Sequence, residues 1–349
     1  MEVMNPPKPA YSTGDPYVDE RLREMVSELS PYDAQMVFEM MTSALALAKD
    51  PISRLDRKIA NTALKEMRYA FNVFAPYRNV RKVTIFGSSR TAKGRPEYAL
   101  ARDFSRTIAD RDWMVVTGAG PGIMEAGHEG AGGARSFGVN IMLPFEATAN
   151  PYIAGDPKLI NFKYFFTRKL MFIKESDAFV LLPGGFGTLD EAFELLTLIQ
   201  TGKSDLHPIV MLDVPHGTYW KSFDRYLREE LLEDGYIAES DLELFTYTDD
   251  LNQAVEEIER FYRVYHSQRY VNDRLIFRLN SMPSEEELAV LSKEFDDILE
   301  GPIEPTGPSA GEIRDNDVVD LPRIALNFDR IHAGRLRALV DRLNDTAPN

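Results

Sequence analysis

The sequence predicts an α/β protein in which helices flank a parallel sheet, with an N-terminal helical segment and a mostly helical C-terminal extension. Three observations predict this class. Short apolar runs alternate with helical patterns from residue 81 to residue 232. Glycine-rich loops follow three of these runs. The parts of the chain before and after this alternating region have mainly helical patterns. Because such alternation requires crossover connections, we expect a Rossmann-like sheet that binds ligands at the carboxyl ends of its strands.

The composition restricts the classes of function. The chain has 349 residues, enough for a large core with additions, and an ordinary apolar content of 44%. Its net charge of −15 argues against binding a nucleic acid polymer or a membrane surface. The absence of cysteine excludes disulfides and a cysteine nucleophile. The sequence lacks a signal peptide and an apolar run of membrane-spanning length, so we expect a cytoplasmic protein without membrane contact.

Four segments are expected along the chain. Residues 1–16 contain four prolines and are predicted to form a flexible arm. An N-terminal helical segment covers residues 17–78, the Rossmann-like core covers residues 79–250, and a C-terminal extension covers residues 251–349.

The N-terminal segment is predicted to form three helices, which we expect to pack against a core or a second subunit. The first two cover residues 18–29 and 31–49. Ser30 is placed to cap the second helix, and Asp50 is expected to cap the third helix in the same way.

The remaining elements follow from short apolar runs and cap signals. In the core, strands are predicted over residues 83–86, 114–117, 139–143, 161–165, 179–182 and 209–212, and helices over residues 96–110, 123–134, 167–175, 188–201 and 219–232. After the core we expect helices over residues 250–262, 284–299 and 331–343, a linker-like loop over residues 301–311 and a strand over residues 323–328. A capping box of Ser284 and Glu287 marks the start of the second of these helices.

Three glycine loops are expected to converge, because each follows a strand of the same parallel sheet. They begin at Gly87, Gly118 and Gly184. In the third loop, Thr188 is predicted to cap the next helix and Glu191 to lie in its first turn. The amino end of a helix binds phosphate because its unpaired N–H groups and its dipole both favour an anion. Glu191 would then lie close to a bound phosphate ester.

Other chemistries fit the sequence less well. The GAGPG run at residues 118–122 does not match the G-x-G-x-x-G dinucleotide pattern, and no segment matches the Walker pattern. The five histidines are scattered, so we expect no metal site. Ser88 and Ser89 lack a nucleophile-elbow context and are expected to donate hydrogen bonds to a ligand. Arg168 is either a solvated surface charge or the charge partner of a phosphate or a reacting sugar.

The motifs together resemble those of a known family. The run from Pro183 to Glu191 matches the pattern PGGxGTxxE in full, and Arg168 and Lys169 lie upstream of it. GSSR at residues 87–90 and GAGPGIME, which begins at residue 118, match two earlier loops. This combination resembles the signature of the LOG ("lonely guy") family, formerly labelled lysine decarboxylase-like. The resemblance covers about half of the chain.

The resemblance implies an enzyme, a nucleoside 5′-monophosphate phosphoribohydrolase. Such enzymes hydrolyse the N-glycosidic bond of AMP or related purine nucleotides, or of cytokinin riboside monophosphates, to a free base and ribose 5-phosphate. The resemblance implies no cofactor, no metal and a homodimer or higher homo-oligomer. It implies a catalytic pair, Arg168 and Glu191. It also implies a substrate-binding set: Gly87, Ser88, Ser89, Gly118, Gly120, Gly122, Met124, Glu146, Lys169, Gly184, Gly185, Gly187, Thr188 and Thr197.

Two departures from the short members favour the long bacterial branch of the family. Glu125 stands where short members commonly have glycine, and long segments flank the core. Both favour general nucleotide catabolism over a cytokinin-specific role. A rival interpretation is a non-catalytic carrier of a nucleotide or of the molybdenum cofactor, although a pure carrier would not need the pair Arg168 and Glu191.

The expected mechanism passes through an oxocarbenium-like state of the sugar. We expect Glu191 to be ionised, to stabilise the developing positive charge and to polarise the attacking water. Arg168 is expected to keep Glu191 ionised and to anchor the nucleotide.

Overall fold

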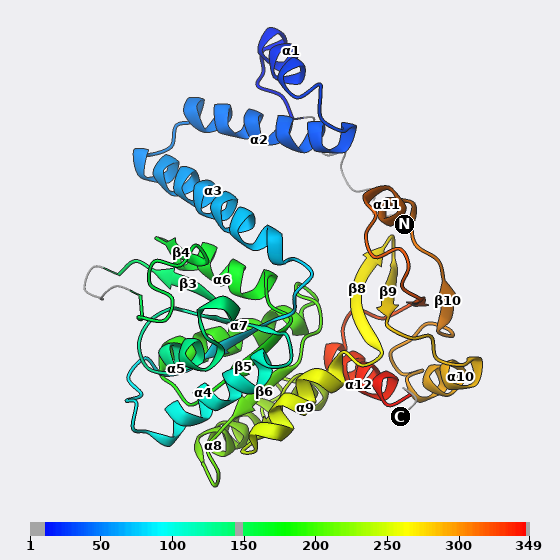
Figure 1. Ribbon diagram of the computed structural model, residues 1–349. Coiled ribbons are helices and arrows are strands. Elements are labelled where there is room, and N and C mark those ends of the chain that lie inside the picture. The colour runs from blue at the N-terminus through cyan, green and yellow to red at the C-terminus, as the bar shows by residue number, and fades with distance from the viewer. Residues whose placement is uncertain (1–10, 144–148, 347–349) are drawn as a thin grey trace. The chain divides into compact units, whose positions relative to one another are not determined.

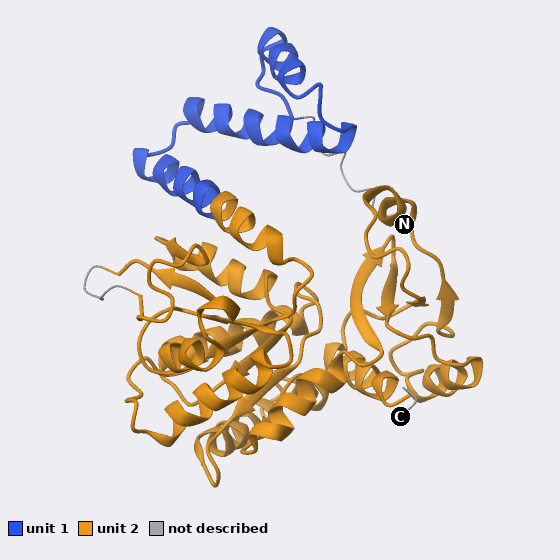
Figure 2. Cartoon of the chain, in the orientation of Figure 1, with its two compact units in different colours: residues 1–66 blue, residues 67–349 orange. Residues whose placement is uncertain are grey.

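The structure is a computed structural model, which describes residues 11–143 and 149–346. The chain divides into two compact units, Met1–Glu66 and Met67–Asn349 (Figure 2). Within the described ranges, no helix is both long enough and apolar enough to cross a membrane. Glu146, one of the predicted substrate contacts, lies outside the described residues.

The first unit contains α1 (Pro16–Met25), α2 (Pro31–Lys49) and the first part of α3 (Arg54–Phe74). Its small core contains Leu22, Val26 and Phe38. The cap of α2 is confirmed, since the Ser30 side chain accepts a hydrogen bond from the amide of Asp33.

The predicted cap of α3 was wrong. The Ser53 amide donates to the Asp56 carboxylate at 2.9 Å, and the Asp56 amide donates to Ser53 Oγ at 3.1 Å. This reciprocal pair satisfies two donors at once. Asp50 instead ends α2, where its own amide donates to the carbonyl of Ala46 at 2.8 Å.

The second unit contains the predicted sheet. Its seven strands run in the order β4-β3-β2-β1-β5-β6-β7, and every neighbouring pair is parallel. The strands are β1 (Lys82–Phe86), β2 (Met114–Thr117), β3 (Ser136–Ile141), β4 (Leu159–Phe162), β5 (Ala178–Leu181), β6 (Ile209–Leu212) and β7 (Thr246–Thr248). The Rossmann-like fold is therefore confirmed. The chain moves outward from β1 to β4 and returns on the other side of β1 with β5, which places the topological switch point between β1 and β5.

Helices cover both faces of the sheet (Figure 1). Because successive strand side chains point to opposite faces, Val83 and Ile85 pack with one helical layer and Phe86 with the other. The first layer consists of α4 (Pro96–Ala109), α5 (Ile123–Ala131) and α9 (Leu251–Phe261). The second layer consists of the end of α3, α6 (Phe165–Lys174), α7 (Phe186–Gln200) and α8 (Tyr219–Tyr226), which continues as a π-helix over Leu227–Leu232. Short 3₁₀ helices cover Ala75–Tyr77, Gly133–Arg135 and Glu239–Leu244.

The C-terminal extension contains a sheet that the sequence analysis did not predict. Four antiparallel strands run in the order β10-β11-β9-β8. They are β8 (Tyr265–Val271), β9 (Arg274–Leu279), β10 (Glu304–Thr306) and β11 (Arg323–Leu326). The helices are α10 (Glu285–Glu294), with the predicted capping box, α11 (Ala310–Asp315) and α12 (Ala333–Asn344). The predicted linker over residues 301–311 was wrong in part, because β10 lies inside it as an edge strand, where a proline is tolerated.

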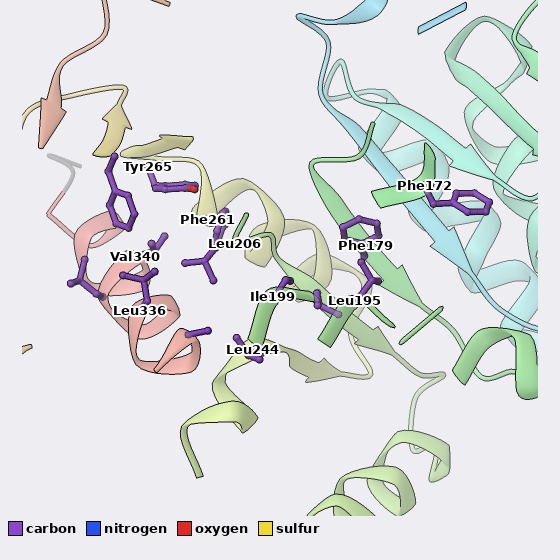
Figure 3. Close-up of a cluster of buried hydrophobic side chains, with 14 of the residues drawn as sticks. Phe172, Phe179, Leu195, Ile199, Leu206, Leu244, Phe261, Tyr265, Leu336 and Val340 are labelled. Carbon is purple, nitrogen blue, oxygen red and sulfur yellow. The ribbon is translucent and has the colours of Figure 1, made fainter. Parts of the chain in front are cut away.

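A single cluster of buried apolar side chains joins the large sheet to the C-terminal extension (Figure 3). Phe179 of β5 and Leu195 of α7 belong to the cluster on the sheet side. Tyr265 of β8 and Leu336 of α12 belong to it on the extension side. The extension is thus part of the same hydrophobic core as the sheet.

Candidate functional site

The three glycine loops lie side by side, as predicted. They follow β2, β1 and β5, which are neighbours in the sheet. The amide of Ser88 in the first loop donates to the carbonyl of Pro183 in the third loop at 3.3 Å. The amide of Ile123, just after the second loop, donates to the carbonyl of Ser88 at 3.1 Å. The first loop therefore connects the other two.

The third loop leads into α7 earlier than predicted. Gly185 has the extended conformation of an N-cap, and α7 begins at Phe186. The prediction that Thr188 caps this helix was therefore wrong, because the cap falls on the glycine three residues before it. Thr188 occupies the first turn instead. The prediction that Glu191 lies in the first turn was also wrong, because the earlier start of α7 places Glu191 in the second turn. It lies behind the first N–H groups of the helix, which have no intrahelical acceptor.

Close packing explains the need for glycine in the third loop. A Cβ at Gly184 would overlap Thr188 Oγ1 and lie 3.1 Å from the amide nitrogen of Ser88. The Tyr219 hydroxyl donates to the carbonyl of Gly184 at 2.7 Å and fixes the loop from the side of α8. Sequence analysis did not identify Tyr219. Its only signal was an aromatic residue at the start of the helix after β6.

Glu191 is a buried carboxyl group close to two cations. Its side chain is 10% exposed, and its Oε2 lies 3.8 Å from Lys169 Nζ. Burial raises the pKa of Glu191 to about 7, and the positive charges of Lys169 and Arg168 offset this effect only in part. The sequence analysis expected an ionised carboxylate and did not predict this raised pKa. Near neutral pH the group is divided between its two protonation states, which suits a proton-transfer role.

Lys169 is held by acids of α7. Its Nζ lies 2.9 Å from Asp190 Oδ2, and it also forms an ion pair with Glu194. Although burial opposes the effect, hydrogen bonds to Glu194 and Asp190 raise the pKa of Lys169. Its charge is therefore fixed beside Glu191.

Arg168 lies against the second loop. Its Nε donates to the carbonyl of Val139 on β3 at 2.9 Å, and its guanidinium lies 5.1 Å from the ring centroid of Phe172. A Cβ at Gly118 would overlap this guanidinium and lie 2.6 Å from Met124 Sδ. Of the two interpretations of Arg168, these contacts favour a positioned charge over a solvated one.

The second loop contains a strained residue. Ala119 has a φ of +62°, a left-handed conformation that costs a non-glycine residue about 1–2 kcal/mol. Thr117 Oγ1 accepts from the amide of Ala119 at 3.0 Å. Asn150 Nδ2 donates to the carbonyls of Ala119 and Gly120, each at 3.1 Å. Asn150 in turn contacts His128, which is fully buried.

Sequence analysis missed Asn150 and His128. His128 is one of the five scattered histidines, which the sequence analysis weighs only as metal ligands, and Asn150 is not singled out there. The available signals were an isolated histidine in the helix after the second loop and an asparagine directly before Pro151. Neither residue type in isolation indicates a contact with a glycine loop.

Most predicted substrate-binding residues lie where the three loops meet. This group consists of Gly87, Ser88, Ser89, Gly118, Gly120, Gly122, Met124, Gly184, Gly185, Gly187 and Thr188. Thr197 does not join them. Its side chain is exposed, and it follows Glu191 by six residues, about 9 Å along the axis of α7.

The fold and the site define a class: an α/β protein in which three glycine loops adjoin at the carboxyl ends of neighbouring strands, with a buried carboxyl group beside them. Comparisons with known proteins give the family. The protein-family model described as "possible lysine decarboxylase" matches residues 122–258 of the chain. The chain is 32% identical over 162 residues to a cytokinin riboside 5′-monophosphate phosphoribohydrolase of Mycobacterium tuberculosis, a match that covers 45% of this chain and 82% of that protein. It is 28% identical over 188 residues to the enzyme of the same name LOG3 of Arabidopsis thaliana, covering 52% of this chain and 83% of that protein. The chain therefore belongs to the LOG family.

A solved structure is also similar. The molybdenum cofactor carrier protein from Chlamydomonas reinhardtii is 19% identical, with a TM-score of 0.36, and the match covers 52% of this chain and 97% of that chain.

Proposed function

We propose that the protein hydrolyses the N-glycosidic bond of nucleoside 5′-monophosphates, releasing a free base and ribose 5-phosphate. The observation that carries this proposal is the buried carboxyl group of Glu191. Its pKa, raised to about 7 by burial, falls in the range in which a general base works best at neutral pH. The phosphoribohydrolases among the family's members support the same reaction class.

In this proposal the phosphate binds at the third loop. The amino end of α7 supplies N–H groups and a favourable dipole, and the exposed Gly185 and Gly187 leave the backbone accessible to the anion. The ribose then extends toward Glu191, one turn further along the helix. Binding energy from the phosphate, which does not react, positions the sugar for reaction.

Glu191 acts in its ionised form on the water and on the sugar. As the bond between C1′ and the base nitrogen breaks, positive charge develops on the ribose, and the carboxylate stabilises it. The water oxygen bonds to C1′ and passes a proton to Glu191, while the base leaves with the electrons of the broken bond and takes up a proton. Arg168 and Lys169 limit the rise in the pKa of Glu191, so that an ionised fraction is available.

AMP and related purine nucleotides are the proposed substrates, with cytokinin riboside monophosphates as a second group. The test is incubation of the protein with a panel of nucleoside monophosphates, followed by chromatography for free base and ribose 5-phosphate. We expect both products in equal amounts from at least one purine nucleotide. If no nucleotide is cleaved although AMP binds in calorimetry, the protein is a carrier, and binding of the molybdenum cofactor becomes the next test.

A further inference from the structure

The second glycine loop is held by two buried residues to which the reaction assigns no role. Asn150 contacts the loop through three hydrogen bonds. Its amide donates to the carbonyl of Ala119 at 2.8 Å, and its side-chain nitrogen donates to the carbonyls of Ala119 and Gly120. Its side-chain oxygen accepts from the amide of Tyr152 at 3.3 Å. These contacts fix which way the side-chain amide points, with the nitrogen toward the loop.

The position of the proton on His128 follows from its neighbours. His128 Nε2 lies 3.0 Å from the carbonyl of Phe137 on β3. A carbonyl only accepts hydrogen bonds, so Nε2 carries the proton and Nδ1 of the neutral ring must accept. Nδ1 lies 3.1 Å from Asn150 Nδ2, which donates to it. The same amide nitrogen thus donates both to the histidine and to the loop.

We propose that His128 and Asn150 form a positioning pair that holds the second glycine loop, and through it Arg168, in the geometry needed for the reaction. Neither residue touches the substrate. The loop places Gly118 directly against the guanidinium of Arg168, so a shift of the loop moves the cation next to Glu191. The hydrogen bonds from Asn150 also keep Ala119 in its strained left-handed conformation.

The pair depends on a neutral histidine. A protonated ring would present an N–H group at Nδ1 to Asn150 Nδ2, which lies 3.1 Å away and also donates. Its available acceptor on the same side chain is Asn150 Oδ1, which lies 3.3 Å from Nδ1. A turn of the amide that brings Oδ1 to the protonated ring would move the nitrogen away from the carbonyls of Ala119 and Gly120. Burial lowers the pKa of His128, which keeps the ring neutral at physiological pH.

The other groups around His128 do not reverse this preference. Thr117 Oγ1 from β2 lies 3.1 Å from Nε2 and carries no charge. The hydrogen bonds to the Phe137 carbonyl and to the Asn150 side chain, and the charge of Asp156, favour the protonated ring, but burial has the larger effect on the pKa of His128. Lys158 forms an ion pair with Asp156 at 2.8 Å, which reduces the influence of that charge.

The isosteric variant Asn150→Asp tests the pair. It retains an oxygen for the amide of Tyr152 but cannot donate to the loop carbonyls. We expect amide hydrogen exchange of residues 118–122 to accelerate by roughly tenfold or more, the effect of losing about one buried hydrogen bond. We expect kcat/KM for AMP to fall by roughly 10- to 100-fold, the effect of a small misplacement of a reacting group. The matched control is Ser176→Ala, which removes the buried hydrogen bond between Ser176 and Thr84 away from the loops.

The kinetic part of this inference rests on the proposed function, whereas the exchange measurement does not. If the wild-type protein cleaves no nucleotide, amide hydrogen exchange of residues 118–122 alone decides whether His128 and Asn150 hold the second loop. Loop exchange equal to that of the wild type in Asn150→Asp, or a kcat/KM equal to that of Ser176→Ala, would overturn the proposal.

A pH measurement separates positioning from simple structural support. In the wild type, kcat/KM should fall by more than the tenfold per pH unit of a single proton as the pH drops through the lowered pKa of His128. His128→Gln retains a donor and an acceptor but cannot be protonated, so its profile should keep the slope of about one proton that Glu191 contributes. If log kcat/KM falls with the same slope at acid pH in the wild type and in His128→Gln, the proposed pair is contradicted.

Discussion

At the scale of the residue, Glu191 determines the proposed chemistry, and replacing it gives the most direct test. The change Glu191→Gln preserves size and hydrogen bonding but removes the ionisable group. We expect kcat to fall by roughly 10²-fold or more, because general base assistance is lost, while AMP binding in calorimetry is largely retained. Glu230→Gln, at an exposed acid outside the site, serves as the control. A Glu191→Gln enzyme as active as this control would remove Glu191 from the mechanism.

The pKa of Glu191 predicts a dependence of activity on pH. Because the proposed base must be ionised and burial raises its pKa to about 7, kcat/KM should rise about tenfold per pH unit between the lowered pKa of His128 and pH 7, and become constant above pH 7. The pH dependence of kcat/KM reports the free protein, which is the state described here. A rate profile measured from pH 5 to pH 9 checks the prediction. A kcat/KM that is constant from pH 5 to pH 9, or highest near pH 5, would mean that the ionised form of Glu191 is not the active form.

The raised pKa of Glu191 could not be predicted from the sequence. Arg168 and Lys169 suggested an ionised carboxylate, because opposite charges lower the pKa of an acid. Burial has the larger effect in the structure, since the side chain is only 10% exposed. Burial of one side chain depends on packing from several elements. A local motif does not specify it.

At the scale of the element, the glycine loops depend on what packs against them. The change Gly118→Ala adds one methyl group where the guanidinium of Arg168 and the sulfur of Met124 already lie. Both are ends of flexible side chains, so we expect the fold to persist while Arg168 is displaced. Turnover of AMP should fall by roughly tenfold or more, with a change of only a few degrees in the unfolding temperature.

A second alanine substitution provides the control for this prediction. Gly94 lies on the loop after β1, and a Cβ there would meet no atom within 4 Å. Gly94→Ala should leave turnover unchanged. If Gly118→Ala and Gly94→Ala turned over AMP equally fast, the contact between Gly118 and Arg168 would have no catalytic importance.

The elements of the core could be predicted because their signals are local. The strand over residues 114–117 and the strand over residues 209–212 agree with β2 and β6 at both ends, since each is a short buried apolar run. The hairpin of β8 and β9 could not be predicted in this way. β8 contains a polar run of histidine, serine, glutamine and arginine, and most of its residues are only half-buried. Its strand conformation depends on pairing with β9, which is a tertiary contact.

At the scale of the whole molecule, the C-terminal extension shares the hydrophobic core of the large sheet. The buried cluster extends from Phe179 of β5 to Val340 of α12 (Figure 3). A continuous core of this kind favours one cooperative unfolding transition for the unit Met67–Asn349. The sequence predicted the extension but not this connection, because apolar periodicity shows that a helix buries a face without showing which partner covers it.

The positions of the tryptophans make this cooperativity measurable. Both tryptophans, Trp113 and Trp220, are buried among residues of the large sheet and its helices. Leu339 is fully buried on α12 in the extension. The change Leu339→Ala should cost about 2–5 kcal/mol of unfolding free energy, because it removes buried apolar atoms and leaves a cavity. If the unit unfolds cooperatively, the transition seen by tryptophan fluorescence should move to lower temperature by about 2–4 °C for each kcal/mol lost.

The control is Ile313→Ala, at a side chain that is 61% exposed on α11. This change should leave the temperature of the tryptophan transition unchanged. A tryptophan transition unchanged by Leu339→Ala, while circular dichroism shows an earlier loss of structure, would mean that the extension unfolds separately from the sheet that carries the site.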